Sequence, residues 1–265
     1  MTAPEVALDR VRRHLAAAGA ASLGRFKSRY LERRLQSRCR HRGAADLSAY
    51  ADLLDHDPEE VGRLVSAVAL GVTSFFRNPS AWRRLGSLVS SAVPGGQRCH
   101  AWSAACATGE EAWSLALLLE DQVRTGRLSA WEVEATDLDP RNLIVARLGE
   151  YPERARAEVE AVVTLAPDLG AAGRFVVPEV VRRSVRFSVT DLTVAGPRGP
   201  YDVVLCRNVL MYFDAEAQRD VMDVVVSAVR PGGLLMLGKA ELAGYEFLPR
   251  LESVDRPERI YRRAA

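Results

Sequence analysis

The sequence predicts an α/β protein in two parts, an all-helical N-terminal domain over residues 1–92 and a Rossmann-like domain over residues 93–265. Three observations predict this. The first ninety residues show helical periodicity without a strand-like run. Later apolar runs of strand length alternate with helices, the pattern of a mostly parallel sheet. The stretch Ala101–Leu119 passes from a strand through a small-residue loop into a helix, as at the nucleotide pockets of such sheets.

The composition is that of a soluble globular protein, with 48% hydrophobic and 26% charged residues. The longest apolar runs are too short to span a bilayer, so no membrane insertion is expected. The four cysteines form no CxxC pair and the four histidines are scattered. We therefore expect no metal site, no disulfide framework and a cytoplasmic location. We also expect a monomer.

The N-terminal domain is predicted to consist of helices over residues 2–18, 25–42, 46–56, 58–70 and 80–92. Residues 1–90 carry 15 Lys/Arg against 9 Asp/Glu, whereas residues 91–265 carry 21 against 25. The helix over 25–42 holds eight Lys or Arg residues and one acid, with apolar residues at helical spacing. Its cationic face, with Arg34 and Arg38 one turn apart, is either a solvated surface or a docking site for an acidic partner.

Two polar residues flank a pair of phenylalanines just before the turn signal Asn78-Pro79. They are Thr73 and Arg77, and both are candidates for function. Phe75, between them, is expected in the core. The stretch Pro94-Gly95-Gly96 marks the expected domain boundary.

The second domain is predicted to contain helices over residues 110–124, 140–148 and 215–229. The predicted strands cover residues 99–104, 132–136, 185–189, 201–206, 234–238, 249–254 and 259–263. Because the last two strands are adjacent, we expect an antiparallel hairpin at one edge, a feature of methyltransferase sheets more than of dehydrogenase sheets. Residues 151–184 fit the alternation badly and are interpreted as an insertion.

The first helix of the predicted sheet domain opens with the acidic pair Glu110-Glu111. Two carboxylates at this position would repel a pyrophosphate but favour a cation or ribose hydroxyls. S-adenosylmethionine, a nucleoside that carries positive charge, therefore fits better than NAD or ATP. We expect Glu110 to contact this cofactor and Glu111 only to cap the helix.

Other polar residues follow predicted strands, where ligands bind in open α/β sheets. Asp137 ends the second strand, where an acid accepts hydrogen bonds from ribose hydroxyls. Asp191 follows the next strand and is predicted to contact the adenine amino group. Arg207, Asn208 and Tyr212 follow the strand that ends at Cys206. Two further acids are predicted to cap helices, namely Asp139 and Asp214.

Five segments, in order and at fitting spacings, resemble the CheR-type chemotaxis receptor methyltransferases, which have a class I methyltransferase sheet. The segments are TSFFR (73–77), WSAACATGEEAWSLA (102–116), ATDLDP (135–140), CRNVLMYF (206–213) and PGGLLMLGKAE (231–241). The helical front also resembles the N-terminal domain of that family. The resemblance covers roughly residues 25–260.

The resemblance implies methylation of glutamate side chains on the cytoplasmic helical bundle of chemoreceptors, with S-adenosylmethionine as cofactor and S-adenosylhomocysteine as product. It implies Arg77 and Tyr212 at the reacting centre, and receptor docking by Arg33, Arg34 and Arg38. The residues that it implies for the cofactor site are Thr73, Arg77, Ala105, Glu110, Asp137, Leu138, Asp191, Leu192, Arg207 and Asn208.

The chain departs from the family pattern at several positions. Gly71 replaces the usual Asn two residues before Thr73, and Asp191 replaces the usual Asn before Leu192. The family's GHSE-like segment reads Gly238-Lys239-Ala240-Glu241. The insertion lacks the family's aromatic strand before its hairpin, so binding of a receptor tether peptide is not expected.

A glutamate acceptor is ionised at neutral pH, with a reference pKa near 4.3, and needs no general base. This agrees with the absence of a histidine or paired-carboxylate constellation. An RNA or small-molecule methyltransferase is an alternative, but Phe26 and Tyr30, the aromatics among the arginines, are predicted to face the core, so no nucleic acid is expected. A silent cofactor-binding scaffold is the other alternative.

Overall fold

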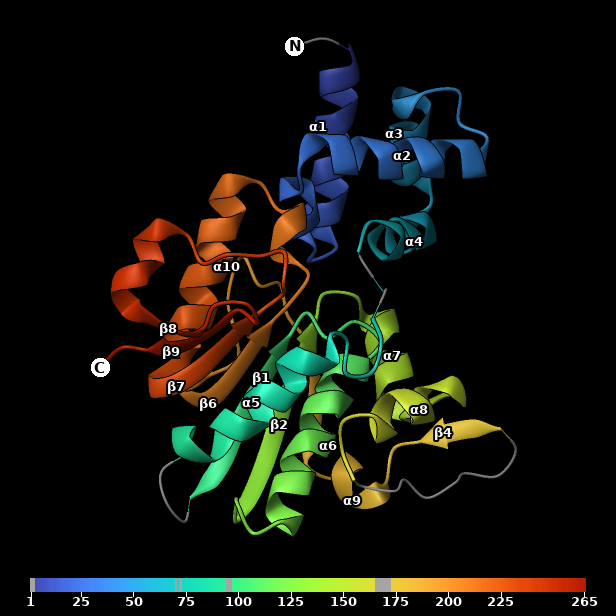
Figure 1. Ribbon diagram of the computed structural model, residues 1–265. Helices are drawn as coiled ribbons and strands as arrows, with labels where there is room; N and C mark the ends of the chain where they lie inside the picture. The colour runs from blue at the N-terminus through green and yellow to red at the C-terminus, as the bar shows by residue number, and fades with distance from the viewer. Residues whose placement is uncertain (1–2, 70, 72, 94–96, 165–172) are drawn as a thin grey trace.

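The computed structural model describes residues 3–69, 71, 73–93, 97–164 and 173–265 (Figure 1). Its N-terminal helices lie at one end of an α/β sheet domain, as Figure 1 shows. They are α1 (Ala3–Ala17), the short 3-10 helix η1 (Ala21–Arg25), α2 (Ser28–Arg42), α3 (Leu47–His56) and α4 (Pro58–Val68). The predicted helices are confirmed with small shifts of their ends. The 3-10 helix η1 occupies the predicted break, and α2 begins at Ser28 instead of residue 25. Residue 70, the predicted end of the fourth helix, lies outside the described residues.

Capping groups account for the start of two of these helices. The Asp46 side chain accepts a hydrogen bond from the Ala49 N–H, and the Asp57 side chain accepts one from the Glu60 N–H. Each carboxylate satisfies an N–H that has no partner within the helix. Helix α2 ends at Gly43, whose φ of 67° is the left-handed conformation typical of a helix terminus.

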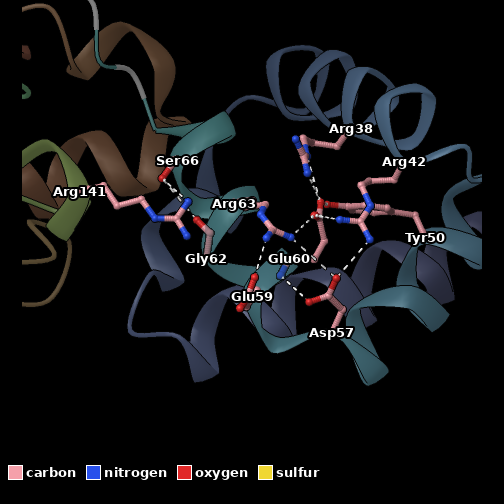
Figure 2. Close-up of polar contacts among 10 residues, drawn as sticks. All are labelled: Arg38, Arg42, Tyr50, Asp57, Glu59, Glu60, Gly62, Arg63, Ser66 and Arg141. Atoms are coloured by element: carbon pink, nitrogen blue, oxygen red, sulfur yellow. Dashed lines mark hydrogen bonds and ion pairs between the residues drawn. The ribbon is translucent and has the colours of Figure 1, made fainter.

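The side chain of Glu60 is completely buried and joins three helices (Figure 2). It accepts hydrogen bonds from Arg38, from the Arg42 Nη1 at 2.9 Å and from the Tyr50 hydroxyl at 2.8 Å. Burial alone would raise the pKa of Glu60, but the hydrogen bonds from Arg38 and Tyr50 hold it below its usual value. The network fixes α2 against α3 and α4.

This network corrects the prediction that Arg38 lies on the outer face of α2. Its guanidinium points inward, and its side chain is only 14% exposed. The carboxylate that draws it in is 22 residues away in sequence. Helical periodicity could not show this, because it assigns charged side chains to the solvent face.

The sheet has seven strands in the order β5-β2-β1-β6-β7-β9-β8. Strands β5, β2, β1, β6 and β7 are parallel, and β9 runs antiparallel to both β7 and β8. The predicted mostly parallel sheet with an antiparallel edge hairpin is therefore confirmed. The strands are β1 (Arg98–Ala104), β2 (Ala130–Asp137), β5 (Val185–Val189), β6 (Tyr201–Cys206), β7 (Val229–Leu237), β8 (Leu251–Asp255) and β9 (Ile260–Arg263).

Helices cover both faces of the sheet, as the apolar run Val203–Cys206 of β6 requires. Val203 and Leu205 face the core under α5 (Pro79–Ala92) and α6 (Glu110–Arg124), whereas Val204 and Cys206 face the core under α10 (Ala215–Ala228). Successive strand residues point to opposite faces, so one strand supplies both layers. Helix α7 (Pro140–Leu148) packs near the β5 edge.

Helix α5 belongs with the sheet by its packing. Its buried residues, including Trp82, Leu85 and Val89, share a core with α6 and the sheet (Figure 1). The expected division after residue 92 would separate this helix from the layer that it covers, so the packing favours a division near residue 70. The predicted boundary signal, residues 94–96, lies outside the described residues.

The insertion forms a second, two-stranded sheet that packs against the same core as α5 and α6. Strand β3 (Glu150–Pro152) pairs antiparallel with β4 (Arg174–Val176), and the helices α8 (Arg154–Glu160) and α9 (Glu179–Arg182) accompany them. Strand β3 was not predicted, because it is only three residues long. Residues 165–172 of the insertion lie outside the described residues. Within the described ranges, no helix is long and apolar enough to cross a membrane.

Replacing Glu60 by alanine should destabilise the protein by about 3 kcal/mol, because two arginines lose the carboxylate that compensates them. Glu59→Ala is the matched control, since the Glu59 side chain is 79% exposed and pairs only with Arg63. It should change stability by less than about 0.5 kcal/mol. Urea unfolding followed by circular dichroism measures both, and equal effects would contradict the role given to Glu60.

Candidate active site

A cavity of about 310 Å³ lies at the carboxyl ends of β1, β2 and β6, where the sheet meets the N-terminal domain. Its volume is at the lower end of the range for small-molecule sites. Both domains contribute to its wall. The lining residues are Ser22, Leu23, Phe26, Ala69, Thr73, Ser74, Arg77, Ala105, Ala107, Glu111, Asp137, Leu138, Thr190, Leu192, Arg207, Asn208, Val209, Tyr212 and Phe213.

The loop after β1 turns sharply at the floor of the cavity. Ala105 and Ala107 both adopt positive φ, at 57° and 50°, and Gly109 has φ of 97°. A Cβ added to Gly109 would lie 2.7 Å from the Ala146 Cβ, so only glycine fits there. The small residues that the sequence shows in this loop are therefore needed by its backbone.

Asp137 is fixed at the end of β2 by three donors. Its carboxylate accepts hydrogen bonds from the Ala107 N–H at 2.8 Å, the Asp139 N–H at 2.9 Å and the Asn142 Nδ2 at 3.1 Å. Burial raises the pKa of Asp137, and these donors oppose the shift. A carboxylate has about four acceptor positions, so it retains capacity for a ligand hydroxyl. Asp139 caps α7 as predicted, by accepting from the Arg141 N–H.

Glu111 forms a buried ion pair with Arg207. Its Oε2 lies 3.3 Å from the Arg207 Nη1, and its Oε1 accepts from the Ser103 hydroxyl at 3.1 Å. Burial raises the pKa of Glu111 and lowers that of Arg207, and the attraction between them opposes both shifts. Glu111 lies on the cavity wall.

The two acids of α6 lie the opposite way from the prediction, since Glu111 and not Glu110 lines the cavity. Glu110, predicted to contact the cofactor, accepts a hydrogen bond from the Thr108 hydroxyl at 2.7 Å and borders a separate small hollow with Glu158 and Tyr151. Glu111, predicted only to cap the helix, reaches the cavity. Adjacent helical residues point about 100° apart, and the sequence could not show which one faces the sheet.

Arg77 combines a fixed backbone with a free side chain. Its carbonyl oxygen accepts from the Arg207 Nη2 at 2.7 Å and from the Trp82 Nε1 at 3.1 Å. The Arg207 guanidinium lies over the Trp82 ring, 5.4 Å from its centroid. The Arg77 side chain is exposed on the cavity wall and makes no hydrogen bond or ion pair with another described residue. Phe75 is in the core, as expected.

Tyr212 ends the short helix η2 (Leu210–Tyr212) and also lines the cavity. Its ring contacts that of Tyr30 at a centroid distance of 5.1 Å, and its carbonyl oxygen accepts from the Lys27 N–H at 2.8 Å. The N-terminal domain therefore touches the backbone and the ring of Tyr212. The sequence missed this contribution, because Phe26 and Tyr30 gave only the signal of a helix core. Asp214 caps α10 as predicted.

Two further predictions need correction. Asp191 does not line the cavity, because its carboxylate accepts from the Ser22 N–H at 3.0 Å and from Thr193. This bond ties the loop after β5 to the N-terminal domain, while the neighbouring Leu192 does line the cavity.

The second correction concerns the predicted docking arginines. Arg33 is exposed, as a docking residue must be. The Arg34 Nε instead donates to the Tyr30 hydroxyl at 2.9 Å, and Arg38 is bound to Glu60.

The cavity suits the cofactor that the sequence suggested. Two buried carboxylates, Asp137 and Glu111, offer acceptors for hydroxyl and ammonium groups. The lining residues Leu138, Leu192 and Val209 add apolar surface that a nucleoside base can contact. Within the described residues, no group of three metal-ligating side chains is present. A sheet of this topology with this cavity defines a class I S-adenosylmethionine-dependent methyltransferase.

The comparisons with known proteins give the family. The model described as CheR methyltransferase, all-alpha domain, matches residues 7–69, and the model described as CheR methyltransferase, SAM binding domain, matches residues 71–251. The chain belongs to the CheR methyltransferase family. These matches, like the packing of α5, favour a division near residue 70.

Three relatives illustrate the range of similarity. The chain is 30% identical to the chemotaxis protein methyltransferase of Listeria monocytogenes over 83% of each protein. It is 34% identical to chemotaxis protein methyltransferase 1 of Pseudomonas aeruginosa, over 67% of this chain and 68% of that one. It is also 34% identical to an uncharacterised 104.1 kDa protein of Rhodobacter capsulatus, over 90% of this chain but only 26% of that protein.

Glu111→Gln should weaken S-adenosylhomocysteine binding by about 10- to 100-fold, the loss expected when a hydrogen bond to a charged group is removed. Glu110→Gln is the matched control and should change the affinity less than about threefold, because this side chain lies outside the cavity. Titration calorimetry measures both dissociation constants. A larger loss in Glu110→Gln would restore the assignment predicted from the sequence.

Proposed function

We propose that this protein methylates glutamate side chains on the cytoplasmic helical bundle of chemoreceptors, in sensory adaptation. The observation that carries the proposal is the unpaired guanidinium of Arg77 on the wall of a cavity whose deeper acids suit a cationic cofactor. An anionic acceptor needs a cation to hold it and no base to activate it. Among the described residues that line the cavity there is no histidine.

S-adenosylmethionine, when bound, supplies an electrophilic methyl group on a sulfonium. The protein contributes orientation and a site protected from water, effects that contribute up to roughly 7–11 kcal/mol in well-aligned systems. Arg77 would hold the acceptor carboxylate, and the Tyr212 hydroxyl would hydrogen-bond near the methyl donor. Asp137 and Glu111 would bind the nucleoside and amino-acid parts of the cofactor. The products are a glutamyl methyl ester and S-adenosylhomocysteine.

The outer face of α2 supports an acidic protein as the partner. Arg29 and Arg33 are exposed one turn apart, and neither forms an ion pair with another described residue. Arg33 was among the predicted docking residues, and Arg29 joins it in place of Arg34 and Arg38, whose guanidiniums are engaged within the domain. The aromatic residues of this region, Phe26 and Tyr30, pack between the domains and offer no stacking surface for RNA. The named chemotaxis relatives support the same substrate class.

Arg77→Ala should reduce methyl transfer to receptor-containing membranes by about 100-fold, because the acceptor carboxylate is no longer held in line. Arg83→Ala, an exposed arginine of α5 away from the cavity, is the control and should keep wild-type turnover. Labelled methyl incorporation, with mass mapping of the ester, measures the effect. Turnover near wild type in Arg77→Ala would remove this residue from the reacting centre.

The double variant Arg29→Glu/Arg33→Glu should raise the KM for receptor about tenfold and leave kcat and S-adenosylhomocysteine binding unchanged, because it alters only surface attraction. Arg124→Glu/Arg127→Glu makes the same charge change on exposed residues at the opposite edge of the sheet and should leave KM unchanged. Steady-state kinetics at two salt concentrations tests both. An equal rise in KM for the two doubles would show a general charge effect instead of a docking face.

A further inference from the structure

The segment Gly238–Glu241, which follows β7, has no role in the site as described so far. Its last residue, Glu241, is only 4% exposed. No lysine, arginine or histidine of the described chain forms an ion pair with it. A buried carboxylate without a cation is costly unless hydrogen bonds satisfy its oxygens.

Backbone N–H groups satisfy this carboxylate. The Glu241 Oε2 accepts from the Asn208 N–H and from the Gly238 N–H, each at 2.8 Å, and the Oε1 accepts from the Met211 N–H at 3.3 Å. Three N–H donors of the described residues converge on the group, and a carboxylate, which only accepts, matches such a set. Two of the donors belong to the loop that carries Arg207, Asn208 and Tyr212.

That loop has a backbone that needs support. Asn208 has φ of 60°, in the left-handed region that is uncommon for residues other than glycine. The turn below it leaves no free space, since a Cβ added to Gly238 would lie 2.5 Å from the Glu241 Oε2 and 2.8 Å from the Asn208 N. Glycine at 238 therefore allows the carboxylate and the loop to approach each other.

We propose that Glu241 is a positioning residue for methyl transfer, whose carboxylate fixes the loop Arg207–Tyr212 so that Asn208 and Tyr212 face the cavity. The proposal rests on the proposed function only for the role of Tyr212. The hydrogen bonds from Asn208 and Met211 hold the two parts of the loop at one anchor. Lys27 holds the same loop from the other domain, through the Tyr212 and Met211 carbonyl oxygens.

The test compares Glu241→Gln and Glu241→Ala with the control Glu252→Gln, an exposed glutamate on β8. The carbonyl oxygen of a glutamine can still accept from Asn208 and Gly238, but its NH2 group would face the Met211 N–H, which is also a donor. Amide exchange measured by NMR should therefore accelerate at Met211 alone in Glu241→Gln. It should accelerate at both Met211 and Asn208 in Glu241→Ala.

Function is measured on the same variants. S-adenosylhomocysteine affinity should fall about tenfold in Glu241→Ala, because Asn208 and Arg207 lose their fixed positions. On receptor membranes, kcat should fall by up to about 100-fold with little change in KM, the size of effect that a displacement of about 1 Å produces. Glu241→Gln should be intermediate, and Glu252→Gln should match wild type in every measurement.

Gly238→Ala disturbs the same anchor without removing the carboxylate and should accelerate exchange at Asn208. Exchange that accelerates equally in the β6 core, Val203–Leu205, would indicate a general loss of stability and overturn the proposal. So would unchanged exchange at Asn208 and Met211 in Glu241→Ala. If wild-type protein methylates no receptor, the proposed function fails, while the exchange and affinity measurements still decide the role of Glu241.

Discussion

The buried ion pair between Glu111 and Arg207 connects the parts of the site. Glu111 comes from the start of α6 and Arg207 from the end of β6, and the same guanidinium donates to the backbone of Arg77. One guanidinium therefore ties together the start of α6, the end of β6 and the segment before α5, all on the wall of the cavity. Either charge buried alone would destabilise the protein, so the two side chains are held in place together. Because the Arg207 guanidinium lies over the Trp82 ring, the pair also constrains the position of α5.

The elements and the cofactor could be predicted from the sequence, because both depend on local patterns. Asp137 was identified by its place after a strand, and the antiparallel edge by two adjacent strands. The assignments that failed depend on the direction of one side chain relative to a distant partner. Glu110 and Glu111 differ only by rotation about a helix, and the inward turn of Arg38 follows from Glu60, which lies in another helix.

The change from asparagine to aspartate at position 191 illustrates the same limit. A carboxylate after β5 was expected to meet the adenine base, but it accepts from the Ser22 N–H of the other domain. Loops that connect domains are positioned by contacts between residues far apart in sequence. The periodicity of the sequence does not predict such contacts. The helical N-terminal domain is for this reason also part of the cavity wall.

The shared wall has an evolutionary consequence. Ser22, Leu23 and Phe26 face the cavity from the helical domain, and Tyr30 packs on Tyr212 across the boundary. Recombination that exchanged whole helical domains between relatives would bring together cavity halves that had not been selected as a pair. The two domains are therefore expected to diverge by matched point changes along this wall more readily than by exchange of whole modules.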